Sequence, residues 1–226
     1  MTEGDLIVFR EGFKPSPKIT LTPEELSHER ARRLNKNPHH LEIRDGFGKS
    51  YLYSFVPGIK HLTLVEERDL VRKQKEHSLA IALPKGNRLD FFLQKATEIG
   101  ISKVYFCVFQ HSIRKEFNLE RAKKVVAEAA SQSHQPDLLQ MEVVDATDWI
   151  QKEQQNVIVM DPYSSTPFQV SDFVDKIPLI GPEGGFHPEE IKLMDGYKIR
   201  RVKWQGGILR TETAGIVAAS LLAFGT

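Results

Sequence analysis

This sequence has little or none of several features that would each point to a class of protein. Its 226 residues include one cysteine, Cys107, which excludes an internal disulfide and favours a reducing compartment. Lys and Arg (31) nearly balance Asp and Glu (30), so the net charge of +1 gives no overall sign of nucleic-acid binding. No apolar run approaches the roughly 20 residues that cross a bilayer, and residues 1–5 do not begin a signal peptide. We therefore expect a cytoplasmic protein without a membrane segment.

Motifs of metal and phosphate chemistry are also missing. The eight histidines show neither H-E-x-x-H nor H-x-x-E-H spacing, and one cysteine cannot form a thiolate cluster, so no metal site is expected. The Gly-rich stretch near the C-terminus lacks the Lys-Ser/Thr of a P-loop, and no G-x-G-x-x-G follows the first strand of the second half. P-loop nucleotide enzymes and Rossmann oxidoreductases are therefore disfavoured.

The first 72 residues carry the signals of a small β-rich module. Short strands are predicted at 6–9, 18–21, 41–44, 50–56 and 62–65, with an Asp45-Gly46 turn signal between two of them. One helix interrupts them, because Thr22 and Glu25 form a capping box. Its basic residues include Arg30 and Arg33, which fit either a bound RNA backbone or a solvated surface.

The second part of the chain alternates strands and helices. The charged run 66–77 (EERDLVRKQKEH) indicates a linker, with a boundary near Arg72 between domains 1–72 and 73–226. Strands are predicted at 79–83, 103–109, 141–144, 157–160 and 179–180, with helices at about 88–99, 119–133, 147–154 and from Pro188. Such alternation is typical of an α/β fold with a mostly parallel sheet covered by helices.

Two segments near the C-terminus are the candidate functional site. In IPLIGPEGGF (177–186) a buried strand ends in an exposed loop, where Gly184 and Gly185 allow a ligand to approach the main chain closely. In GGILRTETAGIVAASLLAF (206–224) Thr211 is a predicted helix cap, with Glu212 in the first turn and Arg210 just outside it. The helix that follows, 214–224, is apolar on nearly every side and is either central to a core or shared with a partner subunit.

Taken together and in this order, IGPEGGF and LRTETA resemble the RsmE family of ribosomal RNA methyltransferases, which belongs to the knotted SPOUT class. The resemblance implies transfer of a methyl group from S-adenosylmethionine to N3 of a uridine in 16S ribosomal RNA of the small subunit. It also implies a trefoil knot in the C-terminal domain, an N-terminal RNA-binding β-barrel like PUA or OB domains, and a homodimer with the active site at the shared interface.

The same resemblance assigns the walls of the cofactor pocket. They are Ile180, Gly181, Pro182, Glu183, Gly184 and Gly185 on one side, Trp204, Gln205, Gly206, Ile208 and Leu209 on another, and Thr211 and Thr213 on the third. Exposed backbone in Gly-rich turns suits this role, because main-chain N–H and C=O groups can read an adenine.

Methylation at N3 requires the imide proton to leave, which places negative charge on the ring oxygens. Arg210 is the candidate cation that stabilises this charge. Glu183 and Glu212 are the candidate bases, and the sequence does not choose between them. Lys85, Lys95, His111 and Arg114 complete the candidate RNA-binding positions and would contact phosphates.

The sequence departs from the family pattern at three places that suit RNA contacts. Gly207 stands where an arginine is usual, 110–112 reads Gln-His-Ser for Glu-Arg-Ser, and 131–135 reads SQSHQ for EQSGR. Two alternatives therefore stay open. One is a SPOUT methyltransferase that acts on another base or on a ribose hydroxyl, and the other is a non-catalytic RNA-binding protein of the same fold.

Overall fold

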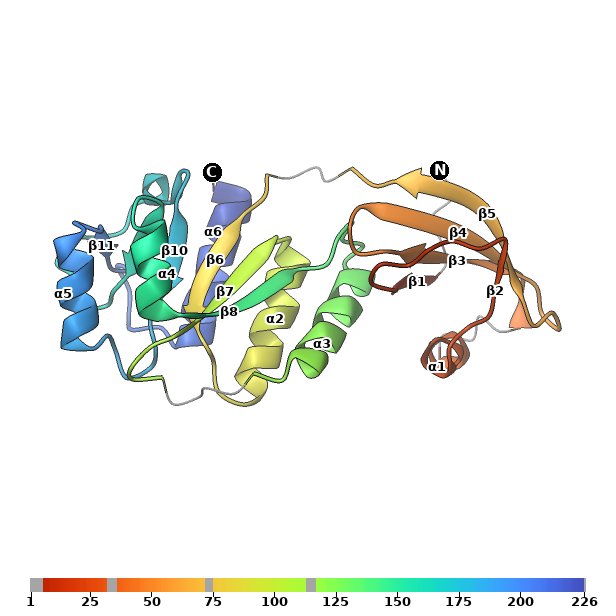
Figure 1. The fold of residues 1–226 in the computed structure, drawn as a ribbon, viewed down its shortest axis with the longest axis horizontal. Helices are drawn as coiled ribbons and strands as arrows, with labels where there is room; N and C mark the ends of the chain where they lie inside the picture. The colour runs from red at the N-terminus through yellow and green to blue at the C-terminus, as the bar shows by residue number, and fades with distance from the viewer. Residues whose placement is uncertain (1–5, 32–35, 72–74, 113–116, 226) are drawn as a thin grey trace. The chain divides into compact units, whose positions relative to one another are not determined.

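A computed structural model describes residues 6–31, 36–71, 75–112 and 117–225 of the chain (Figure 1). The chain divides into two compact units, each described below by itself. The first comprises Met1–Lys73 with Ala127–Leu138, and the second comprises Gln74–Val126 with Leu139–Thr226. The sequence places a boundary near Arg72, which lies outside the described residues, but gives no sign that 127–138 would pack with the first unit.

The first unit is built on a five-stranded sheet with the order β1-β3-β4-β5-β2. β1 and β3 are parallel, and the other neighbours are antiparallel. The elements are β1 (Leu6–Phe9), β2 (Lys18–Ile19), α1 (Pro23–Ala31), β3 (His39–Arg44), β4 (Lys49–Phe55) and β5 (Leu62–Asp69). Leu41, Ile43 and Tyr53 of β3 and β4 are fully buried in one apolar cluster, and the intervening residues Glu42 and Leu52 are buried as well, so both faces of these strands are covered. Figure 1 shows that this sheet is curled, which fits a barrel-like domain.

The capping box predicted for α1 is present. The Glu25 N–H donates to the Thr22 hydroxyl at 3.3 Å, and the Thr22 N–H donates to the Glu25 carboxylate at 2.8 Å. Arg10 donates to both carboxylate oxygens of Glu25, at 2.8 and 2.6 Å. Burial alone would raise the pKa of Glu25, but the hydrogen bonds from Arg10 and Thr22 outweigh it and hold that pKa below its ordinary value.

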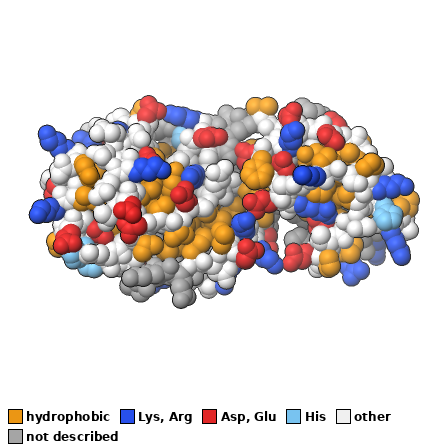
Figure 2. Space-filling view, in the orientation of Figure 1, with side chains coloured by type: hydrophobic (Ala, Val, Ile, Leu, Met, Phe, Trp, Pro, Cys, Tyr) orange, Lys and Arg blue, Asp and Glu red, His pale blue; other side chains and the backbone are white. Residues whose placement is uncertain are grey.

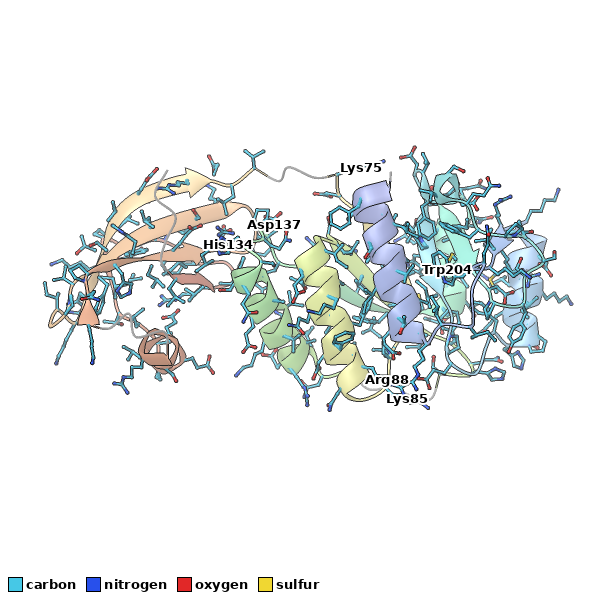
Figure 3. All side chains as sticks on the ribbon, turned by 180° about the vertical axis from the view of Figure 1, so that it is seen from behind. Lys75, Lys85, Arg88, His134, Asp137 and Trp204 are labelled. Atoms are coloured by element: carbon cyan, nitrogen blue, oxygen red, sulfur yellow. The ribbon has the colours of Figure 1, made fainter. Side chains whose placement is uncertain are left out.

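Residues 127–138 belong to the first unit because their polar groups bind its strands. The Ser131 hydroxyl donates to the carbonyl of Ile7 on β1. Arg44 at the end of β3 donates to the carbonyls of His134 at 2.8 Å and Gln135 at 2.6 Å, and His134 is labelled in Figure 3. The guanidinium of Arg44 is almost wholly buried, so these carbonyls satisfy donors that water cannot reach.

The second unit is an α/β layer structure around a six-stranded sheet with the order β11-β9-β10-β6-β7-β8. All five neighbouring pairs are parallel. The strands are β6 (Ser78–Ala82), β7 (Lys103–Val108), β8 (Gln140–Asp145), β9 (Val157–Met160), β10 (Ile177–Ile180) and β11 (Arg201–Val202). The helices are α2 (Asn87–Ile99), α3 (Leu119–Gln132, which belongs to the first unit from Ala127 on), α4 (Ala146–Glu153), η2 (Val170–Phe173), α5 (Pro188–Gly196) and α6 (Thr211–Gly225). The predicted fold class, a mostly parallel sheet covered by helices, is confirmed for this unit.

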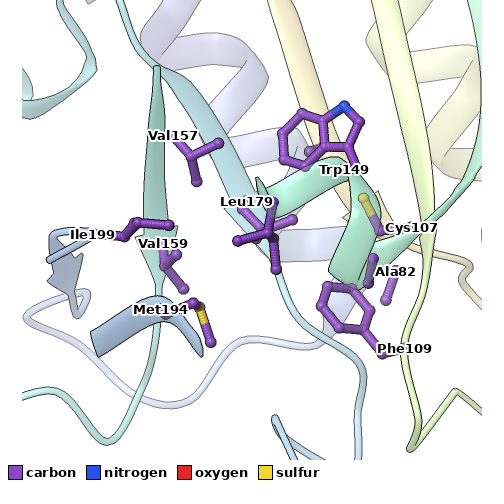
Figure 4. Packing of buried hydrophobic residues seen from close by; sticks show 12 residues of the cluster. Ala82, Cys107, Phe109, Trp149, Val157, Val159, Leu179, Met194 and Ile199 are labelled. Atoms are coloured by element: carbon purple, nitrogen blue, oxygen red, sulfur yellow. The ribbon is translucent and has the colours of Figure 1, made fainter. Parts of the chain in front are cut away.

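Helices cover both faces of this sheet, so its inner strands β6, β9 and β10 are almost wholly buried, whereas no residue of the edge strand β8 is buried. On one face α4 and α5 supply Trp149 and Met194 to a cluster with Cys107, Val159 and Leu179 (Figure 4). On the other face α6 packs against α2, β6 and β10.

Helix α6 approaches the sheet closely because its buried positions carry small side chains. Ala214, Gly215, Ala218 and Ala219 are all buried. A Cβ at Gly215 would lie 2.7 Å from the ring of Phe92, so this position has no room for a larger residue. The expectation that this helix is central to a core is therefore met on one side, and its last turn leaves other apolar side chains exposed.

The structure corrects the linker predicted at 66–77. Residues 66–69 continue β5 instead, where Glu67 pairs with Tyr51 and Asp69 with Lys49 of β4. The prediction of a linker is wrong for these four residues because an antiparallel sheet tolerates charged side chains on a face that water reaches. Charge there indicates an exposed face and not a connection between domains.

Candidate functional site

A cavity of about 860 Å³ lies in the second unit, at the end of the sheet where β9 and β10 terminate and α6 begins. Its volume is within the range of small-molecule sites, roughly 300–1,000 Å³. Loop residues form most of its wall. The lining residues are Arg88, 160–163, 180–186, Ile191, Arg201, 203–211 and Ala214. The two sequence segments singled out above therefore meet around one space.

The loop 181–185 is a tight turn that exposes its backbone. The Gly185 N–H donates to the Pro182 carbonyl at 2.9 Å, and Gly185 has a φ of 76°, a conformation that favours glycine. Gly181 is required for a different reason, because a Cβ there would lie 2.6 Å from the ring of Phe186. That ring packs edge-on against Phe109 at 5.5 Å between centroids, so the loop is held from behind.

The start of α6 differs from the prediction. Thr211 is the first helical residue, and the Arg210 carbonyl accepts the first helical hydrogen bond, from the N–H of Ala214 at 2.8 Å. Thr211 therefore does not cap the helix through its side chain. Its hydroxyl donates instead to the Gly181 carbonyl at 3.4 Å, which ties α6 to the glycine loop. The prediction of Thr211 as cap is wrong by one position, and the hydroxyl connects the two segments.

The two candidate bases share one arginine that the sequence analysis did not select. Nη1 of Arg88, in the first turn of α2, lies 2.6 Å from Glu183 Oε1, and its Nε lies 3.6 Å from Glu212 Oε1. Lys85 Nζ lies 3.1 Å from the other oxygen of Glu183. Glu183 lines the cavity, whereas Glu212 is buried and does not.

The sequence analysis also did not predict the part of the cavity wall at the ends of β9 and β11. Asp161 is 3% exposed, accepts from the Tyr163 N–H at 2.9 Å and pairs with Arg201 at 3.1 Å. These bonds hold a turn that presents Tyr163, which is 81% exposed, at the rim of the cavity. A signal existed for Asp161, because it directly follows a buried strand, and polar residues at the carboxyl ends of parallel strands are common in binding sites.

Trp204 forms the opposite side of the cavity. Its ring packs against Phe168 at 4.7 Å and Phe173 at 6.3 Å between centroids, which fixes its plane. Its Nε1 is buried and has no hydrogen-bond partner among the residues that the structure describes. A buried N–H without a partner is costly, and burial keeps this atom from reaching solvent or the open cavity, so the face of the ring and not its N–H is what Trp204 offers to the site. Figure 3 labels this residue.

Most of the predicted cofactor-binding residues line the cavity. Two predicted site residues in the first turn of α6 do not. Glu212 is buried behind Arg88, and Thr213 is exposed outside the cavity. Arg210 is exposed and lies in the wall, and no ion pair of its guanidinium is found among the described residues.

Of the candidate RNA-binding residues in the second unit, Lys85 and His111 both contact the glycine loop. Arg30 is exposed on α1, whereas Arg33 and Arg114 lie outside the described residues. Lys95 pairs with Glu98 at 2.8 Å, and His111 Nδ1 lies 3.3 Å from the carbonyl of Gly185. On the face shown in Figure 2, Lys and Arg are interspersed with Asp and Glu, in keeping with the small net charge.

Metal sites and membrane-spanning helices were both sought among the residues that the structure describes. No group of three metal-ligating side chains is found there. None of the helices in those ranges combines the length and apolar character needed to cross a membrane.

Known proteins resemble the chain over nearly its whole length. A ribosomal RNA small subunit methyltransferase E of Aquifex aeolicus is 27% identical over 232 residues, which cover 97% of this chain and 94% of that protein. A protein of the same name from Bacillus subtilis is 28% identical over 245 residues, covering 96% and 94%. The crystal structure of a ribosomal RNA small subunit methyltransferase E from Neisseria gonorrhoeae, bound to S-adenosyl methionine, has a TM-score of 0.78. It is 20% identical and covers 95% of both chains, which supports the fold.

The resemblance drawn from the two C-terminal segments is thus confirmed. A model of the RNA methyltransferase domain matches residues 72–223, well over half of the sequence. The chain therefore belongs to the family of RNA methyltransferase domains.

Proposed function

We propose that this protein transfers a methyl group from S-adenosylmethionine to small-subunit ribosomal RNA, at N3 of a uridine. The observation that carries the proposal is the cavity, where the glycine loop, the 203–209 loop and the start of α6 converge in a chain of this family. The names of the relatives support the RNA class and the cofactor. The choice of N3 rests on the motif resemblance and on the chemistry of the residues below.

The residues of the cavity fit S-adenosylmethionine. The space is large enough, its walls offer main-chain groups from Gly181 to Gly185 and from Gly206 to Leu209, and Trp204 adds an aromatic ring. When bound, the cofactor supplies an electrophilic methyl group on a positively charged sulfur. The uncharged backbone of these loops would hold the adenine and exclude water from the sulfonium.

Arg210 and Glu183 are the residues to which we assign the chemistry of the base. Arg210 would stabilise the negative charge that develops on the uracil oxygens once the imide proton has left. Glu183 would accept that proton, because it lines the cavity and is 30% exposed at its side chain. Glu212 is a weaker candidate, since it is buried outside the cavity.

The remaining family features belong to the same proposal. We assign residues 1–72 to an RNA-binding domain like PUA or OB barrels, and 73–226 to a SPOUT domain with a trefoil knot. We also assign a homodimer, which the family resemblance implies; the exposed aromatic side chains of Phe91 on α2 (51%) and Phe224 on α6 (73%) are available to such an interface. The reaction would take place in the cytoplasm, where ribosomal subunits are assembled.

The test is calorimetric titration with S-adenosylmethionine, followed by methyl transfer to small ribosomal subunits that lack the modification. The methylated nucleotide is then identified by mass spectrometry, which separates uridine N3 from another base or a ribose hydroxyl. Binding without transfer to any of them would support the non-catalytic alternative, and no binding would refute the proposal.

One substitution tests the role of Arg210. We expect Arg210→Ala to leave cofactor affinity within a few-fold and to lower the rate of methyl transfer by about a hundredfold or more, the usual scale for one charge-stabilising group. Arg200→Ala is the matched control, because Arg200 is a half-exposed arginine that pairs with Asp172 and does not line the cavity. Equal rates in the two variants would remove Arg210 from the mechanism.

A further inference from the structure

Among the residues that the structure describes, Arg88 is the one cation that pairs with both C-terminal segments from outside them. It lies in the first turn of α2, lines the cavity, and pairs with Glu183 of the glycine loop and Glu212 of α6. Figure 3 shows Arg88 and Lys85 together at the N-terminal end of α2. Neither the motifs nor the proposed chemistry gives Arg88 a role, so its position between the two carboxylates needs an explanation.

The two carboxylates that pair with Arg88 differ in burial. The Glu212 side chain is only 9% exposed, and its Oε2 has no hydrogen-bond partner among the described residues. A buried carboxylate that lost its cation would be left without compensation, so the pair between Arg88 and Glu212 is hard to break. At 3.6 Å this pair is electrostatic and not a hydrogen bond, so Glu212 holds the guanidinium near the loop by its charge.

Glu183 is the exchangeable partner. Its side chain is 30% exposed, and those of Arg88 and Lys85 are 39% and 44% exposed. Ion pairs that water reaches are worth up to about a fivefold change in an equilibrium constant. A phosphate accepts two parallel hydrogen bonds from a guanidinium and is at least as good a partner as a carboxylate. The exchange of Glu183 for a phosphate is therefore close to balanced.

We propose that Arg88 is a positioning residue which holds Glu183 until a phosphate of the RNA substrate replaces it. The inference rests on the proposed function and deepens it, because it couples binding of the RNA backbone to release of the base. In the free protein, Arg88 and Lys85 occupy both oxygens of Glu183. Once a phosphate takes the place of Glu183 on these two cations, a freed Glu183 oxygen bonds to the imide proton. The N–H bond breaks, and its electron pair stays on the uracil ring.

Competition for Arg88 makes an unusual prediction about RNA affinity. Glu183→Gln removes the competitor, so this variant binds a fragment of small-subunit ribosomal RNA two- to fivefold more tightly in fluorescence anisotropy. In a chain that already carries Arg88→Ala, the same change gains less than it does with Arg88 present, because only Lys85 is then released. Glu142→Gln is the matched control, since Glu142 pairs with Lys103 at 2.8 Å away from the cavity and its loss also removes one negative charge.

Equal gains from Glu183→Gln with and without Arg88 would overturn the proposal, because they would reflect general electrostatics. So would a gain in Glu142→Gln as large as that in Glu183→Gln. Arg88→Ala is also made together with Glu212→Gln, which removes the carboxylate that would otherwise be left unpaired. Thermal unfolding confirms that each variant is folded.

Steady-state kinetics supply a second readout. Arg88→Ala raises KM for RNA several-fold, because the phosphate loses the guanidinium. It leaves kcat within about threefold, because Glu183 is no longer held. Arg88→Lys lowers KM part of the way back to that of the unaltered protein. A residue that merely kept Glu183 in a productive place would lower kcat instead, and that result would refute the role. Absence of methyl transfer in the unaltered protein would refute the proposed function itself.

Discussion

The glycine at 181 offers a sharp test of how the cavity is built. In Gly181→Ala the new methyl group would lie 2.6 Å from the nearest carbon of the Phe186 ring. No real Cβ contact is that short, so the ring or the loop must shift. Phe186 also lines the cavity, and the shift therefore changes the wall that we assign to the cofactor.

The magnitude follows from two opposing effects. Overpacking costs about 1–3 kcal/mol, whereas replacing glycine by alanine stabilises by about 0.4–1 kcal/mol because it restricts the unfolded chain. The balance is a loss of about 0.5–2 kcal/mol in the free energy of unfolding. If the loop takes up the strain, affinity for S-adenosylmethionine falls by roughly 2- to 30-fold.

Urea unfolding and calorimetric titration measure the two quantities. Gly206→Ala is the control, because Gly206 lines the same cavity, has no positive φ and has no atom within 4 Å of a Cβ at its position. It should keep or slightly raise stability. If Gly181→Ala were as stable as Gly206→Ala and bound the cofactor equally well, the close approach of Phe186 would not matter and the reasoning would be refuted.

Three further predictions concern the rest of the chain. Gly215→Ala should destabilise by up to about 2 kcal/mol in urea unfolding, because its Cβ would lie 2.7 Å from the Phe92 ring and the cost of overpacking exceeds the gain in helix propensity. Burial raises the pKa of the Cys107 thiol, so a thiol reagent at neutral pH should label Cys107 only after unfolding; rapid labelling of the folded protein would contradict this. The pKa of Glu25 is lower in the folded state than its ordinary 4.5, so its contribution to stability is present above that pH and is lost as the pH falls through the folded value. Arg10→Ala should flatten this part of the pH–stability curve, and an unchanged curve would exclude the pair as its cause.

Much of the second unit could be predicted from local pattern. The strands at 79–83, 103–109 and 157–160 are short apolar runs bounded by polar residues, and such runs are buried on both faces in a parallel sheet. The glycine loop could be predicted because glycine residues indicate where the backbone is exposed. The two-residue strand β11 was missed, since two residues carry no periodicity.

The candidate site was only partly predictable, because its remaining residues come together through topology. Arg88 follows the first strand of the unit and Asp161 follows the fourth, and the sheet order places β10 between those strands. No spacing in the sequence encodes that order. The pairing of Glu183 with Arg88, across 95 positions, was invisible for the same reason.

The hydrogen bond from Ser131 to Ile7 spans 124 positions, and the first unit is incomplete without the segment that contains Ser131. A ribosome that adds about 5–20 residues per second needs on the order of ten seconds to make this stretch. During that time β1 lacks its contact with Ser131, in the last turn of α3. The amino-terminal sheet therefore lacks this contact until more than half of the polypeptide has been synthesised. A fragment that stops at residue 72 would lack this contact permanently.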